Sequence, residues 1–353
     1  MAGGLEVTPR GGVCWLAEGY ASQRDMALAI KAACPDVRLL VSHRDDRREI
    51  LGCGDIALRE PRDEEERAAF IEEVIRRHAV TVLHAGRRGR WFEGRRARLE
   101  SLGVRLSTGA CREADFALAD NKLQFSTRMR EAGLPVVPAL SIERAEDLRE
   151  ALRTSPFGAV RLCVKPVQGV YGQGFRILDD SVGLRDVLAD TAGRRVPSAW
   201  YLRLLEESPE PLLLMPYCGG DEYSVDMLVR QGRALCSVQR RKHGPLQDLE
   251  APGKATELAY ECARLLGCDG LVNIQLIEAE KGHPLLLEAN LRPSGGIGYG
   301  LAAGCNLPAL WAGLMLGRLD PDEIARRAVR DFRPLTIRPL TVAVPLPPAG
   351  GEG

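Results

Sequence analysis

The chain has 353 residues, 45% of them hydrophobic and 27% charged, which is enough for two or three domains with cores of their own. Lysine and arginine together number 48 and balance 48 aspartates and glutamates, so no bulk charge favours nucleic acid or an anionic membrane. No apolar run reaches the length of a membrane span, and the Gly-rich segment 1–12, a predicted disordered tail, lacks the hydrophobic region of a signal peptide. We therefore expect a cytoplasmic protein whose partners are small molecules.

Cysteine and lysine usage narrows the chemistry further. The ten cysteines are scattered without a CxxC pair, which indicates reduced thiols rather than a disulfide framework or a zinc site. Arginine is the default cation, so a lysine marks a place that suits a compact point charge. The chain has only six lysines: Lys31, Lys122, Lys165, Lys242, Lys254 and Lys281.

Residues 1–110 alternate short apolar runs with helical patterns, which predicts a parallel, doubly wound, Rossmann-like α/β domain. Ser22 and Asp25 have the spacing of a capping box at the start of the first helix. No GxGxxG motif is present, so no nucleotide site is predicted here. The loop at Gly19 follows the first strand, at the edge where such sheets place ligands, although an ordinary surface turn is the favoured interpretation. We expect strands over 13–17, 37–42, 80–85 and 104–107, and helices over 22–33, 63–78 and 95–102.

Residues 111–211 are predicted to contain one or two linker helices, which carry Lys122, and then a small α+β unit. One of its strands ends in Lys165-Pro166 and runs into a glycine loop. This loop lies between two strands, so it is not a Walker A loop, but its backbone N–H groups can still cover phosphates. A flexible β-hairpin is the equally favoured alternative. The loop glycines are Gly169, Gly172 and Gly174.

Residues 212–353 begin with an apolar strand that enters a loop, as an adenine slot requires. The segment supplies Met215, Tyr217 and Cys218, and Glu222 follows at a position suited to a ribose diol. A strand over 234–238 then ends in a cationic cluster that includes Arg240. This cluster is either a solvated turn or a contact to a transferred phosphoryl group. We further expect helices over 256–266 and 307–316 and a last strand over 335–344.

The stretch 271–300 is the centre of the prediction. Two apolar-rich runs flank Lys281-Gly282, which predicts a β-hairpin that places Gln275 opposite Glu288 and Asn273 opposite Asn290. Oxygen-only side chains on a rigid strand suit Mg²⁺, with Mn²⁺ as the alternative ion. Arg292 lies two residues after Asn290, and its guanidinium suits a phosphate carried by that metal ion. For the hairpin alone a solvated polar face is favoured, and the other motifs reverse that preference. The second face, made of Ile274, Leu276, Leu287 and Ala289, belongs in a core.

Taken together, these segments resemble the ATP-grasp superfamily, in particular its carbamoyl-phosphate-synthase-like branch. The resemblance covers about residues 104–317 and, more loosely, the first domain. Each motif is weak alone, but their order and spacing are specific. The motifs are Asp120-Asn121-Lys122, Val164-Lys165-Pro166 with the glycine loop, Gly220-Asp221-Glu222-Tyr223-Ser224-Val225-Asp226, Asn273-Ile274-Gln275, Glu288-Ala289-Asn290-Leu291-Arg292-Pro293-Ser294-Gly295-Gly296 and Gly304-Cys305-Asn306-Leu307-Pro308.

The resemblance implies an ATP-grasp fold with an N-terminal Rossmann-like domain (1–110), linker helices and a lid subdomain (111–211), and a C-terminal antiparallel-sheet catalytic subdomain (212–353). It also implies a role for each matched residue. Lys122 and Lys165 would hold the ATP phosphates, and the loop with Gly169, Gly172 and Gly174 would cover these phosphates. Adenine contacts fall to Met215, Tyr217 and Cys218, and the ribose to Glu222. The metal ligands are Gln275, Glu288 and Asn290, and the catalytic groups are Arg292, Lys165 and Arg240.

The implied activity is that of an ADP-forming ligase that joins a small, amino-acid-like carboxylate to an amine through an acyl phosphate. ATP and Mg²⁺ are the implied cofactors, and a homodimer is left open. A bicarbonate-activating enzyme and a non-catalytic ATP-binding regulator are the alternatives. The single ATP-grasp unit argues against a carbamoyl phosphate synthase, which carries two, and the intact set of metal-ligand candidates argues against a regulator. Residues that select the substrates are expected around 19–23 and after Ser294.

Overall fold

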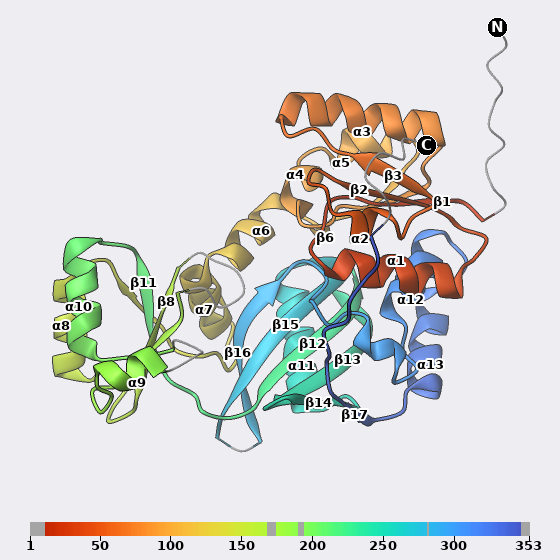
Figure 1. The fold of residues 1–353 in the computed structure, drawn as a ribbon. Helices are drawn as coiled ribbons and strands as arrows, with labels where there is room; N and C mark the ends of the chain where they lie inside the picture. The colour runs from red at the N-terminus through yellow and green to blue at the C-terminus, as the bar shows by residue number, and fades with distance from the viewer. Residues whose placement is uncertain (1–10, 168–173, 190–193, 281, 347–353) are drawn as a thin grey trace, which may run out of the picture. The chain divides into compact units, whose positions relative to one another are not determined.

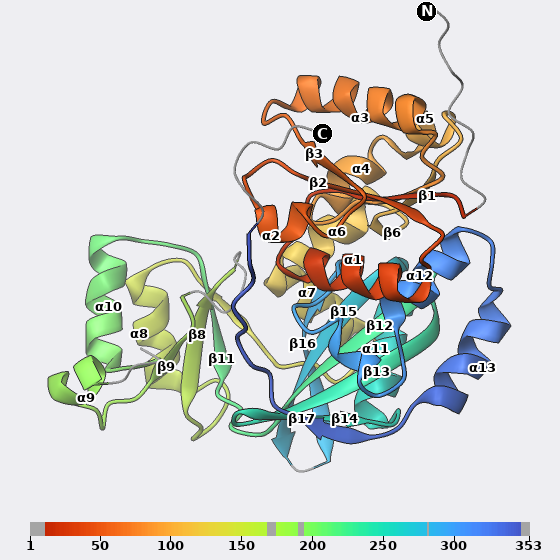
Figure 2. The ribbon, with the colours of Figure 1, turned by 45° about the vertical axis from the view of Figure 1, so that its right-hand side comes forward.

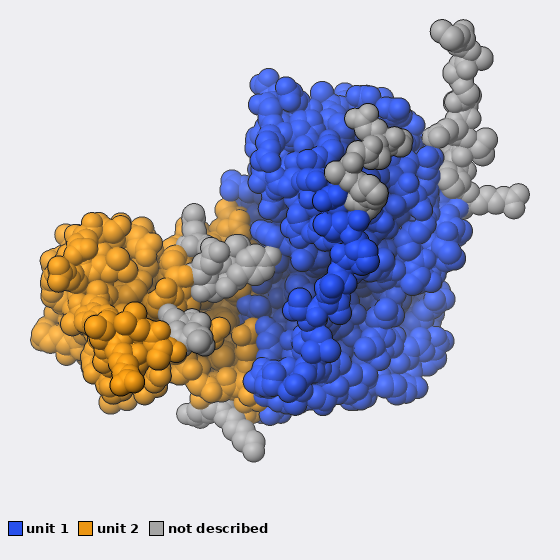
Figure 3. All heavy atoms as spheres, viewed as in Figure 1, with its two compact units in different colours: residues 1–116, 223–275, 289–353 blue, residues 117–222, 276–288 orange. Residues whose placement is uncertain are grey.

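The computed structural model describes residues 11–167, 174–189, 194–280 and 282–346 (Figure 1). Four predictions fall outside the described residues: Gly169 and Gly172 of the glycine loop, Lys281 of the hairpin turn, most of the N-terminal tail, and the end of the chain. The chain divides into two compact units, coloured in Figure 3. Unit 1 comprises 1–116, 223–275 and 289–353, and unit 2 comprises 117–222 and 276–288. The three predicted domain ranges remain a prediction.

A five-stranded parallel sheet of order β3-β2-β1-β4-β5 begins unit 1. This confirms the predicted doubly wound domain, because helices alternate with the strands along the chain. The structure adds α2, β3 and α4, which were not predicted, and the helix expected over 95–102 is present as the shorter α5. The elements are β1 (Val13–Leu16), α1 (Ser22–Ala33), β2 (Arg38–His43), α2 (Arg48–Leu51), β3 (Ile56–Arg59), α3 (Glu64–His78), β4 (Val82–His84), α4 (Gly89–Glu93), α5 (Arg96–Glu100) and β5 (Arg105–Ser107).

The strands of this sheet are apolar on both faces because helices cover both (Figures 1 and 2). Trp15 and Leu40 pack with Ile71 of α3, whereas Leu16 packs with the buried side of α1. The helix expected over 63–78 begins at Glu64, and the side chain of Asp63 caps it by accepting hydrogen bonds from the Glu65 and Glu66 N–H groups. The capping box predicted at Ser22 is wrong. Ala21 occupies the N-cap position without a side-chain cap, so Ser22 is already the first helical residue.

Unit 2 contains a second five-stranded sheet of order β10-β9-β8-β11-β7. Its interior strands β8 and β11 pair antiparallel. Helices α8 and α10 pack on one face through a core that includes Leu148, Val164, Leu205 and Leu214. The elements are α6 (Glu113–Asp120), α7 (Lys122–Glu131), β7 (Leu140–Ile142), α8 (Ala145–Thr154), β8 (Leu162–Pro166), β9 (Arg176–Leu178), α9 (Leu184–Ala189), β10 (Arg195–Val196), α10 (Ser198–Glu207) and β11 (Leu212–Pro216).

The third sheet has the order β16-β15-β12-β13-β14-β17, and β6 pairs with β15 beside this path. It confirms the predicted hairpin as β15 and β16. One expectation is corrected: β13 continues to His243, so Arg240 lies inside a strand and pairs with Leu249 of β14, not in a turn. The elements are β6 (Gly109–Ala110), β12 (Glu222–Arg230), β13 (Arg233–His243), β14 (Leu246–Glu250), α11 (Lys254–Leu265), β15 (Cys268–Glu280), β16 (His283–Asn290), α12 (Leu307–Met315), α13 (Pro321–Asp331) and β17 (Leu335–Ile337).

Helix α12 ties the first sheet to the third within unit 1. Asn306 caps it by accepting a hydrogen bond from the Ala309 N–H, and Pro308 occupies its first turn. Its buried Trp311 donates a hydrogen bond from Nε1 to Ser107 Oγ at 3.1 Å, at the end of β5. One core therefore continues from α1 through α12 to β13. Within the described ranges, no helix is long and apolar enough to cross a membrane.

Candidate active site

The face of the unit 2 sheet opposite α8 and α10 carries the predicted nucleotide residues. β8 and β11 pair so that Lys165 lies opposite Leu213 and Cys163 opposite Met215. Alternation along each strand puts these four side chains on the same face. Cys163, Leu213 and Met215 belong to one apolar cluster that also includes Leu287 of β16. The sheet thus forms an apolar surface with one lysine at its end, as an adenine followed by phosphates requires.

Lys165 is the buried cation of this surface. Its side chain is only 9% exposed. Burial lowers the pKa of the Lys165 ammonium below its usual range; the Glu288 carboxylate raises it and the charge of Lys122 lowers it, with a net shift downward. Unit 2 therefore brings Lys122 and Glu288 within electrostatic reach of Lys165, although the three lie on α7, β8 and β16. Two ammonium groups in electrostatic contact form a group suited to a polyanion.

The predicted adenine and ribose contacts are placed at the end of β11 and the start of β12. Met215 is buried, whereas the Tyr217 side chain is exposed. The Tyr217 N–H donates to the Arg161 carbonyl at 2.7 Å. The Tyr217 N–H is thus engaged in holding the two strands together, so the Cys218 N–H is the better candidate for a backbone hydrogen bond to adenine. Glu222 is the half-buried first residue of β12. Gly174 adopts φ +74° beside Pro166.

Arg240 is the centre of a buried polar network in unit 1, which we call the Arg240 network. Its Nε donates to Asp226 at 2.8 Å, and its Nη2 donates to the hydroxyls of Ser224 and Ser294, each at 2.9 Å. Its Nη1 donates to Gln247 at 2.8 Å. Arg240 is 3% exposed and Asp226 is 1% exposed. The guanidinium is thus committed to protein partners and can act on the site by holding the loop that contains Ser294.

The loop after β16 depends on this network. The Ser294 hydroxyl accepts a hydrogen bond from the Gly296 N–H at 3.0 Å as well as the one from Arg240. A Cβ on Gly296 would lie 2.6 Å from Cζ of Arg240, so only glycine allows this approach. Arg292, half-buried at the start of the loop, has its guanidinium 4.6 Å from the centre of the Tyr20 ring. The network therefore fixes the backbone that presents Arg292.

The three predicted metal ligands lie on the β15–β16 hairpin. Gln275, Glu288 and Asn290 are all half-buried. Gln275 and Asn290 belong to unit 1, and Glu288 belongs to unit 2. Their side chains offer only oxygen ligands, which fits a hard cation such as Mg²⁺. Asn273, expected on the same polar face, instead donates from Nδ2 to Ser224 Oγ and to Asp226 Oδ1, each at 2.9 Å, and is 1% exposed.

Sequence reasoning missed the structural role of Ser224, Asp226 and Ser294. All three were quoted within motifs, but none of them was named as a site residue. A signal was present: Ser224 and Asp226 are two apart in the otherwise apolar run Tyr223–Val229, so they share one face of a buried strand. Buried polar side chains require partners. This alternation could therefore have indicated a buried cation.

Comparison with known proteins gives a consistent set of relatives. A family model described as "ATP-grasp in the biosynthetic pathway with Ter operon" matches residues 208–341. A D-alanine–D-alanine ligase from Anaeromyxobacter sp. (strain Fw109-5) is 26% identical over 319 residues, which cover 84% of this chain and 90% of that enzyme.

Solved structures show the same fold at low identity. An N5-carboxyaminoimidazole ribonucleotide synthetase in complex with ADP superposes with a TM-score of 0.67 and 16% identity, over 94% of this chain and 81% of that chain. An L-amino acid ligase from Bacillus licheniformis has a TM-score of 0.61 and 15% identity, over 92% of this chain and 78% of that chain.

Proposed function

The chain belongs to the ATP-grasp superfamily, and we propose that it joins a small, amino-acid-like carboxylate to an amine through an acyl phosphate, with release of ADP and phosphate. The predicted superfamily and the ligase class are confirmed by these relatives. The bond type and the class of substrate are the proposal. They are supported by the D-alanine–D-alanine ligase and by the structural likeness to an L-amino acid ligase.

The observation that carries the proposal is the electrostatic group of Lys122, Lys165 and Glu288 beside the apolar face of the unit 2 sheet. Met215 and Cys218 line the adenine in this proposal, and Glu222 holds the ribose. Lys122 and Lys165 bind the phosphates, because a compact ammonium approaches phosphate oxygens from several directions. That the glycine loop covers these phosphates stays a prediction, because Gly169 and Gly172 lie outside the described residues.

The metal proposal assigns Mg²⁺, with Mn²⁺ as a possible substitute, to Gln275, Glu288 and Asn290. Magnesium supplies charge neutralisation on the phosphate oxygens when bound. Glu288 then serves two partners, since its carboxylate also interacts with the charge of Lys165. The donor set supports this assignment because its members supply only oxygen ligands.

Arg292 is proposed to hold the γ-phosphoryl group during transfer. The substrate carboxylate oxygen attacks the γ-phosphorus, the bond to the β–γ bridging oxygen breaks, and ADP leaves. The amine nitrogen then attacks the acyl carbon, phosphate leaves with the bonding electron pair, and the nitrogen loses a proton. Arg240 was predicted to be catalytic, and the contacts of the Arg240 network support a positioning role in place of direct contact. Alignment and charge neutralisation are the main contributions a protein makes to such a transfer.

Trapping the intermediate tests the proposal. Hydroxylamine should intercept an acyl phosphate as a hydroxamate, in a reaction that requires ATP, magnesium and an organic acid. The nucleotide product should be ADP, and the reaction should proceed without bicarbonate. AMP as product would refute the mechanism. A strict bicarbonate requirement would support the bicarbonate-activating alternative, and nucleotide binding without turnover over a broad panel of acids and amines would support the regulator. A cytoplasmic location and a homodimer remain predictions from the sequence.

A further inference from the structure

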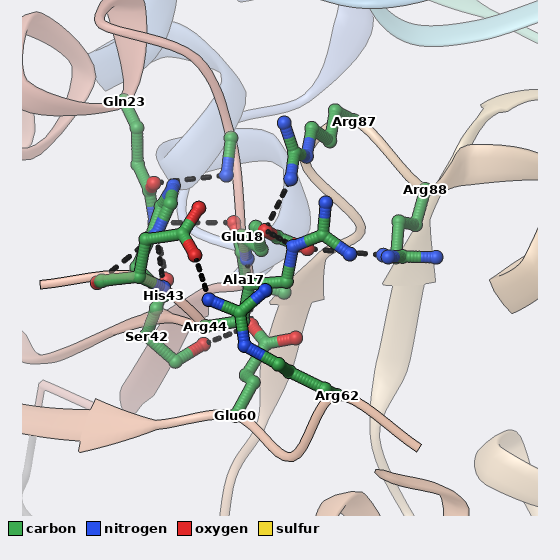
Figure 4. Close-up of polar contacts among 12 residues, drawn as sticks. Ala17, Glu18, Gln23, Ser42, His43, Arg44, Glu60, Arg62, Arg87 and Arg88 are labelled. Atoms are coloured by element: carbon green, nitrogen blue, oxygen red, sulfur yellow. Dashed lines mark hydrogen bonds and ion pairs between the residues drawn. The ribbon is translucent and has the colours of Figure 1, made fainter. Parts of the chain in front are cut away.

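The carboxyl ends of β1, β2, β3 and β4 carry a group of charged side chains that the proposed reaction does not use (Figure 4). In open parallel sheets this edge is where ligands bind. We call the group the arginine cluster. It consists of Glu18, Asp45, Glu60, Arg44, Arg62, Arg67, Arg87 and Arg88.

Glu18 is the anchor of the arginine cluster. Its carboxylate is 1% exposed and accepts hydrogen bonds from Arg87 Nη2 and from Arg88 Nε, the latter at 3.0 Å. Arg44 Nε lies 2.9 Å from the same carboxylate. Burial raises the pKa of Glu18, but the hydrogen bonds from Arg88 and Arg87 and the charges of Arg87 and Arg44 outweigh it, so the net shift is downward. Glu18 is therefore ionised and holds three guanidinium groups together.

Glu60 forms a second layer beneath Glu18. Its Oε1 accepts hydrogen bonds from the Glu18 N–H at 2.7 Å and from the Ser42 hydroxyl at 2.6 Å. Its Oε2 lies 3.5 Å from Nε of Arg67, whose side chain is fully buried. Neither that Oε2 nor Nε and Nη1 of Arg67 has a well-formed hydrogen bond. The buried guanidinium of Arg67 is therefore near the carboxylate of Glu60, but its charge is only partly neutralised there.

The arginine cluster carries an excess of positive charge. Its five arginines face three carboxylates, which leaves two positive charges uncompensated. The pKa of the Arg67 guanidinium reflects this excess. Burial lowers that pKa most, and the charges of Arg88 and Arg44 lower it further. The carboxylates of Glu60 and Glu18 raise it, but the net shift is downward. Positive charge gathered in partly buried positions is stabilised by an anion.

A cation is the weaker alternative occupant. Glu18, His43 and Asp45 each place a possible ligand atom within 4.8 Å of the others. Glu18, however, already neutralises part of the charge of three arginines, and a metal ion would repel all of them. His43 also uses Nδ1 to accept the Asp45 N–H at 2.9 Å. The charges around Glu18 therefore favour an anion.

A narrow pocket adjoins the arginine cluster. Its volume of about 10 Å³ holds no more than one water-sized group, so a carboxylate or a phosphate binds at the mouth of the pocket. Its lining includes Gly19, Tyr20, His84, Gly86, Arg87 and Arg292. Arg87 and Arg292 both face the Tyr20 ring, at 5.6 and 4.6 Å from its centre. A Cβ on Gly86, which has φ +59°, would lie 2.0 Å from the Glu18 carbonyl oxygen, so glycine is required for the turn that brings Arg87 to this edge.

His84 adds an uncharged donor to the same pocket. Burial lowers the pKa of its imidazole to about 4, so the ring is neutral at physiological pH. Its Nδ1 accepts the Gly86 N–H at 3.1 Å, which places the remaining proton on Nε2. The pocket therefore combines a guanidinium, a neutral N–H donor and an aromatic ring, a set suited to a carboxylate or a phosphate monoester.

We propose that this pocket binds a second anionic group of a substrate, so that one of the two molecules joined is an acid with a carboxylate or a phosphate besides the carboxyl group that is activated. Arg87 is the residue that recognises this group, and Glu18 with the rest of the arginine cluster holds Arg87 in place. The statement that the anionic group belongs to a substrate rests on the proposed ligase activity. The anion site itself stands on the contacts of unit 1 alone.

Binding of small anions to the full chain, without nucleotide, tests the site. Glutarate and inorganic phosphate are titrated separately by calorimetry, so that the two arms distinguish a carboxylate from a phosphate subsite. We expect one of them to bind, and Arg87→Gln to weaken that binding at least tenfold, which corresponds to about 1.4 kcal/mol. If neither anion binds the wild-type chain, the proposal is refuted.

Arg88→Gln is the matched control. Arg88 and Arg87 bind the same carboxylate and are 22% and 23% exposed, but only Arg87 lines the pocket. The control should change anion affinity less than threefold. Equal losses in both variants would mean that only the total charge matters, and would overturn the assignment. Should Arg87→Gln fail to fold, Arg87→Lys keeps the charge without the planar fork and should weaken binding by a smaller factor; unchanged affinity in that variant would contradict the site.

Hydroxamate formation links the site to catalysis. With ATP, magnesium and hydroxylamine, L-glutamate should react at a higher kcat/KM than L-glutamine if the pocket takes a carboxylate, and phosphoserine higher than serine if it takes a phosphate. Arg87→Gln should remove that preference. Turnover that favours the neutral member of both pairs would overturn the proposal and leave the ligase activity intact. Anion binding without any turnover would keep the site and refute the ligase.

Discussion

Removing Arg240 should destabilise unit 1 far more than removing its neighbour Arg241. In Arg240→Met, the Asp226 carboxylate stays buried, at 1% exposed, with the Asn273 amide as its one remaining partner within the Arg240 network. The hydroxyls of Ser224 and Ser294 also lose a donor, but each keeps one hydrogen bond, from the Asn273 amide and from the Gly296 N–H. The cost is therefore dominated by one uncompensated buried charge, about 3–5 kcal/mol in the free energy of unfolding.

Two further variants make the estimate specific. Arg241 is 40% exposed, and its Nη1 lies 3.8 Å from Glu250, so Arg241→Met should cost less than about 1 kcal/mol. Adding Asp226→Asn to Arg240→Met removes the buried charge and should recover about 2 kcal/mol or more. Recovery by the second change would show that the charge, and not lost packing, is the main cost.

Urea denaturation followed by tryptophan fluorescence measures these differences. Three of the four tryptophans, Trp15, Trp91 and Trp311, belong to unit 1, so the signal reports the unit that contains Arg240. The reasoning is refuted if Arg240→Met lies within 1 kcal/mol of wild type, or if it loses no more stability than Arg241→Met. In either case the guanidinium would be free to serve the phosphoryl group directly.

The other predictions concern the nucleotide, the metal and acid stability. Lys165→Ala should weaken ATP binding at least tenfold by calorimetry, about 1.4 kcal/mol, and an unchanged affinity in this variant would count against the phosphate role. Because burial lowers the pKa of Lys165, the wild-type affinity should begin to fall, as the pH is raised, at a lower pH than it would with an exposed lysine. Glu288→Ala should abolish turnover at saturating magnesium with an unchanged circular dichroism spectrum, and wild-type activity would refute the metal assignment. The lowered pKa of Glu18 means that its contribution to stability is present above the unfolded value of about 4.3 and is lost as pH falls through the folded value. Glu18→Gln should therefore lose about 1.5–3 kcal/mol at pH 7 and show a smaller difference from wild type near pH 3, whereas a constant difference would contradict the linkage.

Short-range patterns in the sequence determined the class of the fold and most of the candidate nucleotide residues. Apolar runs of period two and helical runs of period 3.6 are written into consecutive residues, so β1, α3, α12 and the β15–β16 hairpin could be predicted from their own segments. Lys165 was found because its neighbours form a motif along the chain. Elements with weak periodicity, such as β14 and α2, were missed.

Only the tertiary structure decided what each charged side chain does. Arg240 followed an apparent strand end in the sequence, yet β13 continues through it and β14 covers it, so a predicted phosphate contact became the centre of a buried network. The arginine cluster brings Arg44, Arg67 and Arg87 to Glu18 and Glu60 from one helix and two separate loops. Such contacts depend on which strands become neighbours and in which register. That choice is made by burial over the whole chain, and no local window of sequence contains it.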